Sequence, residues 1–433
     1  MTVSDKRLDY GCSEGSLNCL TEKGDIPMAS GLSWLDFAEE DRQKMLNVVH
    51  LFKEQGTVDE LGVGVIRDAF ADYFFPGTNT IQTRARYMLF VPWIYLNLEK
   101  KKTPAGEVAR KLRNDEIRLI FALLKSGDDD GIIGKLSKEQ LVRFPSNIYW
   151  NGLSAWGIKL FPGTQEEYHK SFSHYFRLRE QRDSEDQDPN DSDGALYNWH
   201  RGLPSAPNGF LDHAELQLTK EEAVYLQERI LQKQGNSLLA ILVREPEYIQ
   251  ADFLWDHPII SSLPLYLTKE IFHARNFSDS IYGAALMYNL MLSELRNLDE
   301  SIEAYRSEIE KWAEGLSSRW AELIHWYEGL SDFWSCASLK HARITRPTHN
   351  FIQHWLQLIF RETSPHDIRS SEAARRMIHD REVDMKRKRA RLENPSARAQ
   401  WNGASGAYRL SYRWGNSNKM LKDILAGLTR RDG

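Results

Sequence analysis

Apolar side chains recur at helical spacing along most of this chain of 433 residues. In the segment 64–75, for example, Ile66, Phe70 and Phe74 fall on one face of a helix. Strand signals are few and short, and the clearest lies around residues 409–414. The spacing therefore predicts a mainly α fold built from many helices.

The predicted helices are separated by Pro, Gly and clusters of polar residues. They span residues 41–55, 64–75, 80–98, 115–124, 221–232, 278–295, 299–313, 318–326, 349–360, 365–391 and 419–428. Pro92 should kink or divide the third of them. Thr219 and Glu222 form a capping box before the fifth, and Ser370 or Ser371 can cap the segment 365–391.

The composition limits the class of protein. Hydrophobic residues make up 41% of the chain and aromatic residues 11%, which is enough to build a core. No apolar run approaches the roughly 18 residues of a membrane-spanning helix. Three cysteines give neither a disulfide framework nor a zinc motif, and the polar N-terminus lacks the pattern of a secretory signal. We expect a cytoplasmic protein without a structural metal.

Changes in composition along the chain predict four regions. Residues 1–30 are polar and are expected to form a disordered tail. Residues 31–180 form an N-terminal helical region with a candidate active-site motif. Residues 181–194 are acidic, contain Pro and Gly and lack large apolar side chains, which is typical of a linker. Residues 195–433 form a C-terminal helical region with a basic end.

That basic end lies within residues 366–433, which hold 16 Lys/Arg and 8 Asp/Glu and carry a net charge of +8, against −13 for the rest. A local positive field favours binding of a polyanion such as DNA. The alternative is a solvated amphipathic helix, because acidic residues are interleaved with the basic ones. The candidate phosphate-binding residues here are Arg375, Arg376, Arg409 and Arg413.

The segment 59–87 contains a second group of candidates. Gly62 and Gly64 stand where a helix should begin, either to form a structural turn or to bring backbone N–H groups close to a phosphate. Three acidic residues of the segment could act as catalytic carboxylates, namely Asp59, Asp68 and Asp72. The alternative is that they form structural ion pairs with arginines of the same segment, which are otherwise candidates for phosphate contacts: Arg67, Arg84 and Arg86.

Polar and aromatic residues complete the candidate site. The segment 144–153 mixes Pro, Ser, Asn and Gly with bulky rings, which predicts a loop lining a pocket. The candidates for contacts to a base or sugar are Gln82, Tyr87, Tyr149 and Asn151. The alternative assigns these rings to the core and the polar groups to helix capping. The chain contains no phosphate-binding loop of the Walker type, no dinucleotide fingerprint, no zinc-deaminase signature and no nucleophile elbow.

The residues 59–95, taken with 31–36, 145–152 and 410–414, resemble a bacterial family long known only as a domain of unknown function. The resemblance covers most of the chain from about residue 31. Members lie in anti-phage defence loci, some beside BREX-like genes, and the family is similar to the Brig-type DNA glycosylases. The resemblance implies an enzyme that releases glucosylated hydroxymethylcytosine from double-stranded phage DNA, leaves abasic sites, and needs no metal and no organic cofactor.

Leu61-Gly-Val-Gly64 is also similar to the hairpin of helix-hairpin-helix glycosylases, which would place such a core in this chain. In that pattern the catalytic Asp would fall near Gln82, so either another acid supplies the carboxylate or the likeness is accidental. A carboxylate is needed because the N-glycosidic bond between base and sugar breaks through an oxocarbenium-like state, which carries positive charge. We expect Asp68 in this role, with Asp59, Glu60, Asp72 and Asp36 as reserves; no Lys lies within 59–87, which favours a monofunctional hydrolase.

Two other functions remain open from the sequence. The chain could be a non-catalytic DNA-binding adaptor of a defence complex, in which the arginines matter and the carboxylates do not. It could also be a nuclease, although no clear nuclease motif is visible. A hydrolytic glycosylase needs no metal, whereas most nucleases require one.

Overall fold

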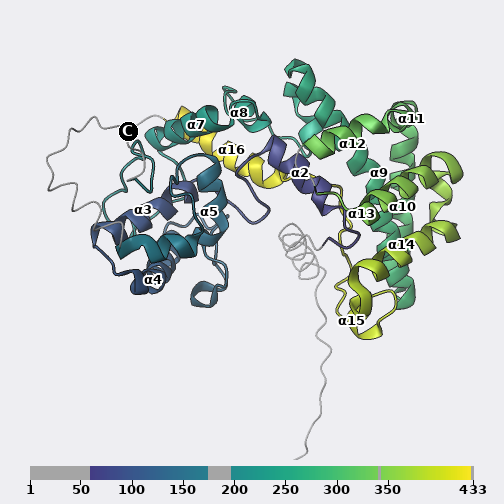
Figure 1. The fold of residues 1–433 in the computed structure, drawn as a ribbon, viewed down its shortest axis with the longest axis horizontal. Coiled ribbons are helices and arrows are strands. Elements are labelled where there is room, and N and C mark those ends of the chain that lie inside the picture. The colour runs from purple at the N-terminus through teal and green to yellow at the C-terminus, as the bar shows by residue number, and fades with distance from the viewer. Residues whose placement is uncertain (1–58, 174–196, 340–342, 431–433) are drawn as a thin grey trace, which may run out of the picture. The chain divides into compact units, whose positions relative to one another are not determined.

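The computed structural model describes residues 59–173, 197–339 and 343–430, and these residues are mainly helical (Figure 1). All of them belong to one compact unit, Phe52–Gly433. Within these ranges the β structure amounts to one isolated antiparallel bridge, between Lys159 and Trp199. The predicted mainly α fold is confirmed. The predicted tail 1–30, linker 181–194 and helix 41–55 lie outside the described residues.

The α-helices of the described ranges differ widely in length and in the length of the segments that connect them. In chain order they are α2 (Gly64–Phe74), α3 (Tyr87–Lys100), α4 (Ala105–Leu124), α5 (Pro145–Ala155), α7 (Lys220–Gln234), α8 (Leu238–Leu242), α9 (Leu265–Leu295), α10 (Asp299–Ser318), α11 (Trp320–Glu328), α12 (Leu330–Leu339), α13 (Arg346–Gln357), α14 (Glu372–Lys386), α15 (Pro395–Ala399) and α16 (Trp414–Thr429). No described helix is both long and apolar enough to cross a membrane.

Two predicted helix caps are confirmed in atomic detail. The Thr219 hydroxyl accepts a hydrogen bond from the Glu222 N–H at 3.2 Å, and the Glu222 carboxylate accepts one from the Thr219 N–H at 3.0 Å. This capping box satisfies two N–H groups that the helix cannot bond internally. Ser371 caps α14 by accepting a hydrogen bond from Ala374. It therefore ends the preceding 3₁₀ helix, Pro365–Ser370, and divides the long helix predicted over 365–391.

Three local predictions are wrong. Residues 80–86 form turns, and α3 begins only at Tyr87. The segment 144–153 is not a loop, because Pro145 opens the helix α5. The strand predicted around 409–414 is absent: Arg413 has a φ of 64°, outside the strand region, and directly precedes α16. The start of α5 follows a local signal, because Pro145 in the first turn and Asn147 in the capping box favour a helix there.

The helix α9 is the main support of the C-terminal elements, since α10, α13 and α14 all pack against it. The loop 59–63 before α2 reaches these elements. The guanidinium of Arg381, on α14, donates a hydrogen bond to the Leu61 carbonyl at 2.9 Å. The candidate acids of the N-terminal motif are therefore held against helices that lie more than 200 residues away in the sequence.

Candidate functional site

A cavity lies beside the loop 59–63, and we call it the Asp59 cavity. Its walls are this loop, Arg67 of α2, residues 281–288 of α9 and the segment 405–410. The cavity has a volume of about 50 Å³. In this conformation it has room for only a few water molecules and is too small for a nucleobase.

Asp59 is fixed at the N-terminus of α2. Its two carboxylate oxygens accept hydrogen bonds from the N–H groups of Val63 and Gly64, each at 2.8 Å. The positive end of the helix dipole and the nearby Arg67 both favour a negative charge at this position. Each oxygen keeps a second lone pair, so the carboxylate can still face a ligand in the cavity.

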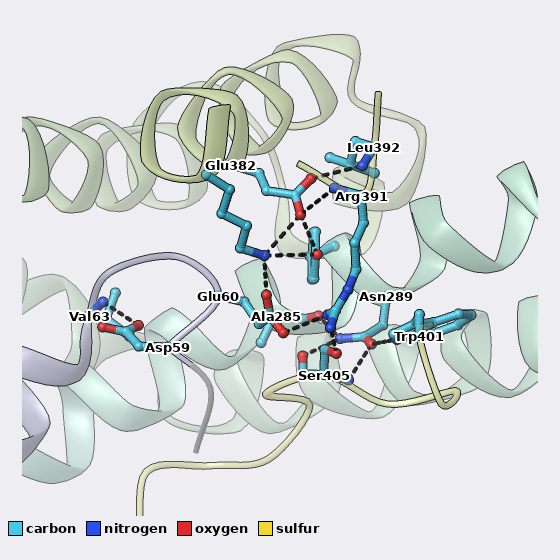
Figure 2. A network of polar contacts seen from close by, with 12 residues as sticks. Asp59, Glu60, Val63, Ala285, Asn289, Glu382, Arg391, Leu392, Trp401 and Ser405 are labelled. Carbon is cyan, nitrogen blue, oxygen red and sulfur yellow. Dashed lines mark hydrogen bonds and ion pairs between the residues drawn. The ribbon is translucent and has the colours of Figure 1, made fainter. Parts of the chain in front are cut away.

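Glu60 points in another direction, into a buried polar network (Figure 2). Its side chain is 4% exposed and pairs with Lys386 and with Arg391, the latter at 2.6 Å. Lys386 also donates hydrogen bonds to the Glu382 carboxylate at 2.9 Å and to the Tyr288 hydroxyl at 3.2 Å. Two carboxylates thus balance two cations, as a buried network requires.

Glu382, on α14, binds the backbone of the segment that follows this helix. Its oxygens accept hydrogen bonds from the backbone N–H groups of Arg391 and Leu392, both at 2.9 Å, and from the Tyr288 hydroxyl at 2.6 Å (Figure 2). Although burial opposes the effect, the hydrogen bonds from Tyr288 and Lys386 hold the pKa of the Glu382 carboxyl below its usual range. The segment that contains the basic run 387–389 is therefore tied to the cavity wall.

Residues 402–410, which we call the strap, form the remaining wall. The Asn289 side chain donates a hydrogen bond to the Ser405 carbonyl and accepts one from the Ser405 N–H, both at 2.7 Å (Figure 2). Arg391 donates to the Ser405 hydroxyl at 2.7 Å. Gly403 and Gly406, on either side, have φ values of 95° and 63° that favour glycine. The strap is thus an irregular segment held by side chains.

Asp68 and Asp72 do not line the cavity. Asp68 pairs with Arg67 at 3.0 Å and with Arg413 at 3.7 Å, and its side chain is 46% exposed. Asp72 also pairs with Arg413 and is 66% exposed. The Asp68–Arg67 pair is one of the structural ion pairs that the sequence left open, whereas Arg413 lies outside the segment considered there. Of the acids considered among the described residues, Asp59 and Glu60 are the ones at the cavity, while Asp36 lies outside those residues.

The candidate substrate-binding residues lie elsewhere. Gln82 is fully buried, and its side chain bonds to the backbone of Gly77 and Asn79, each at 3.1 Å. Tyr87 and Tyr149 are buried and pack against each other, with ring centroids 5.4 Å apart. Asn151 is exposed on α5. The first three meet around the turn before α3, which Tyr149 reaches from α5, and they lie away from the lining of the Asp59 cavity.

Most of the candidate arginines are engaged within the protein. Each of the following pairs with a carboxylate: Arg67 with Asp68 at 3.0 Å, Arg84 with Asp423 at 3.0 Å, Arg86 with Glu222 at 2.7 Å, Arg375 with Glu294 at 2.6 Å, Arg409 with Asp279 at 3.5 Å, and Arg413 with Asp72. A phosphate would have to compete with these carboxylates. Arg376 is exposed and forms no ion pair with a described residue.

Several residues of the cavity and its network escaped prediction from sequence. Tyr282 and Tyr288 lie on α9, Tyr408 lies in the strap, and Lys386 and Arg391 flank the basic run. Nothing in the local sequence marks the three tyrosines, and the basic end of the chain marks Lys386 and Arg391 only as cations, because all five meet the motif only through the tertiary fold. Within the described ranges no three His, Cys, Asp or Glu residues gather as a metal ion would require.

Comparison with known proteins places the chain in a family without assigning a function. The model of DUF6361, a family of unknown function, matches residues 29–427. This agrees with the resemblance to a domain of unknown function over most of the chain. Searches of curated proteins and of solved structures gave no match. The helix that would precede Gly62 in a helix-hairpin-helix motif lies outside the described residues.

Proposed function

We propose that this chain, which belongs to the DUF6361 family, is an anti-phage DNA glycosylase that acts on a flipped, modified base. The observation that carries the proposal is the position of Asp59, a carboxylate fixed at a helix N-terminus in the wall of a cavity that also presents Tyr282, Tyr288 and Tyr408. The resemblance to the Brig-type enzymes supplies the substrate, glucosylated hydroxymethylcytosine in double-stranded phage DNA.

Asp59 would act on the anomeric carbon of the flipped nucleotide. Breaking the N-glycosidic bond builds positive charge on the sugar, and a fixed carboxylate stabilises that charge. The same carboxylate can orient the water that attacks the anomeric carbon. The products are the free base and an abasic site. Asp59 replaces Asp68 as our catalytic candidate, because Asp68 does not line the cavity.

The tyrosines suit the leaving base. A departing base gains negative charge, and hydrogen-bond donors lower the cost of its release. Burial raises the pKa of Tyr282 to about 12, so its hydroxyl is protonated at neutral pH and can donate. Burial also raises the pKa of Tyr408, against the opposing effect of Arg67. Aromatic rings can also stack on the flipped base, which offsets its unstacking from DNA by roughly 1–3 kcal/mol.

Basic residues beside the cavity suit the DNA backbone. Arg387, Lys388 and Arg389 form a short exposed 3₁₀ helix between Lys386 and Arg391, the two cations that hold Glu60. In the described part of the chain, Lys388 and Arg389 have no carboxylate partner. Phosphates bound here would lie close to the Asp59 cavity. A flipped base also requires the cavity to widen, and we assign that movement to the strap.

The direct test is to incubate the purified chain with glucosylated, hydroxymethylated and unmodified DNA, with magnesium or with a chelator. We expect mass spectrometry to detect free base from the glucosylated DNA in both conditions, with abasic sites left in the strand. Magnesium-dependent strand breaks without free base would identify a nuclease instead.

A non-catalytic DNA-binding adaptor is the second candidate. The small volume of the Asp59 cavity favours it, because about 50 Å³ admits only water in this conformation. An adaptor would bind DNA through the run 387–389 and release no base from any of the three DNAs. Its binding would also be indifferent to loss of the Asp59 carboxylate.

A further inference from the structure

A second pocket lies on the N-terminal side of the protein, and we call it the Glu99 pocket. It has a volume of about 260 Å³, and its walls come from α3 and from the segment 197–203. It shares no lining residue with the Asp59 cavity. A ligand here would therefore bind independently of the proposed glycosylase chemistry.

The pocket contains a carboxylate whose charge is not balanced by an ion pair. One oxygen of Glu99 accepts hydrogen bonds from the Tyr168 hydroxyl and from the Asn198 side chain, the latter at 2.9 Å. The other oxygen accepts no hydrogen bond, and the carboxylate forms no ion pair, within the described ranges. A half-buried carboxylate in this state favours a ligand that donates hydrogen bonds.

Flat and apolar surfaces surround this carboxylate. Leu96 and Tyr197, each 37% exposed, present apolar surface to the pocket. The guanidinium of Arg201 stacks on the Tyr197 ring, 3.9 Å from its centroid. Behind them, the Trp199 indole N–H donates to the Tyr168 hydroxyl at 2.9 Å, so the same tyrosine fixes both Trp199 and Glu99.

We infer that the Glu99 pocket binds a nucleoside monophosphate, with guanine as the preferred base. The base would stack on the paired Tyr197 and Arg201 and cover Leu96. Its N1–H and amino group would donate to the open oxygen of Glu99. Its phosphate would lie against the guanidinium of Arg201. A cationic ligand suits the pocket less well, because Arg201 would repel it.

The same chemistry is found in a free nucleotide and in a nucleotide of single-stranded DNA. Calorimetric titration of the full chain with GMP and with a short guanine-containing single strand separates these sources. Tighter binding of the strand identifies DNA as the ligand, and equal or weaker binding identifies the free nucleotide. If neither ligand shows saturable binding, or if a free zwitterionic amino acid binds in place of both, the inference is wrong.

Two variants test the assigned contacts. Tyr197→Ala should weaken GMP binding at least about tenfold, because the stacking surface is lost. Glu99→Gln keeps acceptors for Tyr168 and Asn198. It should reduce the preference for GMP over purine riboside monophosphate, which has the ring without the donors, by about tenfold. Unchanged binding in both variants overturns the inference.

The controls separate this pocket from the proposed active site and from the fold. Tyr266→Ala removes a tyrosine of similar exposure on α9 and should leave GMP binding unchanged. Asp59→Asn should also bind GMP normally. If Asp59→Asn binds GMP normally in the calorimetric titration but no longer releases base, the two sites are independent. If the unaltered chain releases no base, the proposed function is wrong, and the GMP result is unaffected.

Discussion

At the scale of single residues, burial sets the chemistry of Glu116. This side chain of α4 is 1% exposed, and its carboxyl accepts hydrogen bonds from the Ser146 N–H at 2.7 Å and hydroxyl at 3.1 Å. Burial raises the pKa of the Glu116 carboxyl to about 8, which outweighs those hydrogen bonds. The folded protein therefore binds this proton at pH values where the unfolded chain has released it.

This raised pKa predicts how stability depends on pH. The contribution of Glu116 to stability is fully present below its unfolded pKa, near 4.5, and is lost as the pH rises toward 8. Each pKa unit between the folded and the unfolded state changes the free energy of unfolding by about 1.4 kcal/mol at most. We expect Glu116→Gln to match the unaltered protein near pH 5 and to be more stable near pH 8. Thermal unfolding between pH 5 and 9 measures this.

A control on the same helix supports that comparison. Glu107, also on α4, has a side chain that is 45% exposed, so Glu107→Gln should show no stabilisation that grows with pH. If Glu116→Gln is less stable than the unaltered protein at pH 8, the carboxyl is ionised and contributes to the fold, and the argument from burial is wrong.

Gly62 is the residue at which the loop before α2 depends on glycine. Its φ is 72°, and a Cβ would lie 2.2 Å from the Arg381 guanidinium and 2.9 Å from the Met385 sulfur. We expect Gly62→Ala to lower the free energy of unfolding by about 2–4 kcal/mol, from backbone strain of about 1–2 kcal/mol and displacement of Arg381. Urea denaturation measures the change.

Gly209 provides the matched control, because its φ is 70° but no atom lies within 4 Å of a Cβ there. Gly209→Ala should cost only the backbone strain. Equal losses in the two variants would show that close packing on α14 contributes nothing at Gly62. The sequence correctly predicts a turn at Gly62, but it cannot predict Arg381, which meets the turn from 319 positions further along the chain.

At the scale of elements, the strap is the part of the cavity wall best placed to move. Its Ser405 backbone is clasped by Asn289, and its two flanking glycines allow a change of direction. Asn289→Asp keeps the acceptor but removes the donor to the Ser405 carbonyl. We expect amide hydrogen exchange in residues 403–408 to become at least about tenfold faster, while exchange in α7 stays unchanged.

The control for the strap is Asn394→Asp. Asn394 caps α15 by accepting hydrogen bonds from Ser396 and Ala397, and aspartate can cap in the same way. It should leave exchange in the strap close to that of the unaltered chain. If residues 403–408 keep their protection from amide hydrogen exchange in Asn289→Asp, then the hydrogen bonds between Asn289 and Ser405 do not control how the cavity opens.

The elements also show where local sequence determines structure. Thr219, Glu222 and Ser371 predict their caps correctly, because a cap depends on residues within one helical turn. The strand expected around 409–414 fails, because those residues run from the end of the strap into α16 and are shaped by what they pack on. Tyr412, for example, is fully buried and donates a hydrogen bond to the Ala274 carbonyl of α9 at 2.7 Å.

The residues of the candidate site likewise divide into those that the local sequence marks and those that only the tertiary fold brings to the cavity. Asp59 and Glu60 belong to a motif that the sequence singles out, and the structure places both at the cavity. The sequence alone favours Asp68 as the catalytic carboxylate, because the helical spacing places it on a flank of α2 rather than in the core. Its partner Arg413 comes from the other end of the chain and could not be predicted by spacing. Nor could Lys386, which brings a lysine to a motif that contains none.

At the scale of the whole molecule, the positive charge that is available to DNA lies in one short segment of the basic end. The basic end of the chain contributes many arginines that are already paired with carboxylates, so its net charge overstates the surface available to DNA. The run 387–389 is exposed beside the network of Glu60 and Glu382. We therefore assign to this run the main phosphate contacts near the cavity.

Replacing Arg387, Lys388 and Arg389 by alanine tests that assignment. We expect weaker binding to duplex DNA of any sequence, and a salt dependence reduced by about 0.9 for each phosphate contact that is lost. Fluorescence anisotropy at several salt concentrations measures both. The charge-matched control replaces three exposed lysines elsewhere, Lys100, Lys101 and Lys125. Equal effects from the two triple variants would mean that only net charge matters.

The central claim is that Asp59, rather than a neighbouring acid, carries out base release. The most direct measurement compares free base released from glucosylated phage DNA by Asp59→Asn and by Asp68→Asn at matched DNA occupancy. We predict a loss of about 10²–10³-fold for Asp59→Asn, with DNA binding retained, and release within a few-fold of the unaltered chain for Asp68→Asn. Undiminished release by Asp59→Asn, or selective loss in Asp68→Asn, would contradict the account.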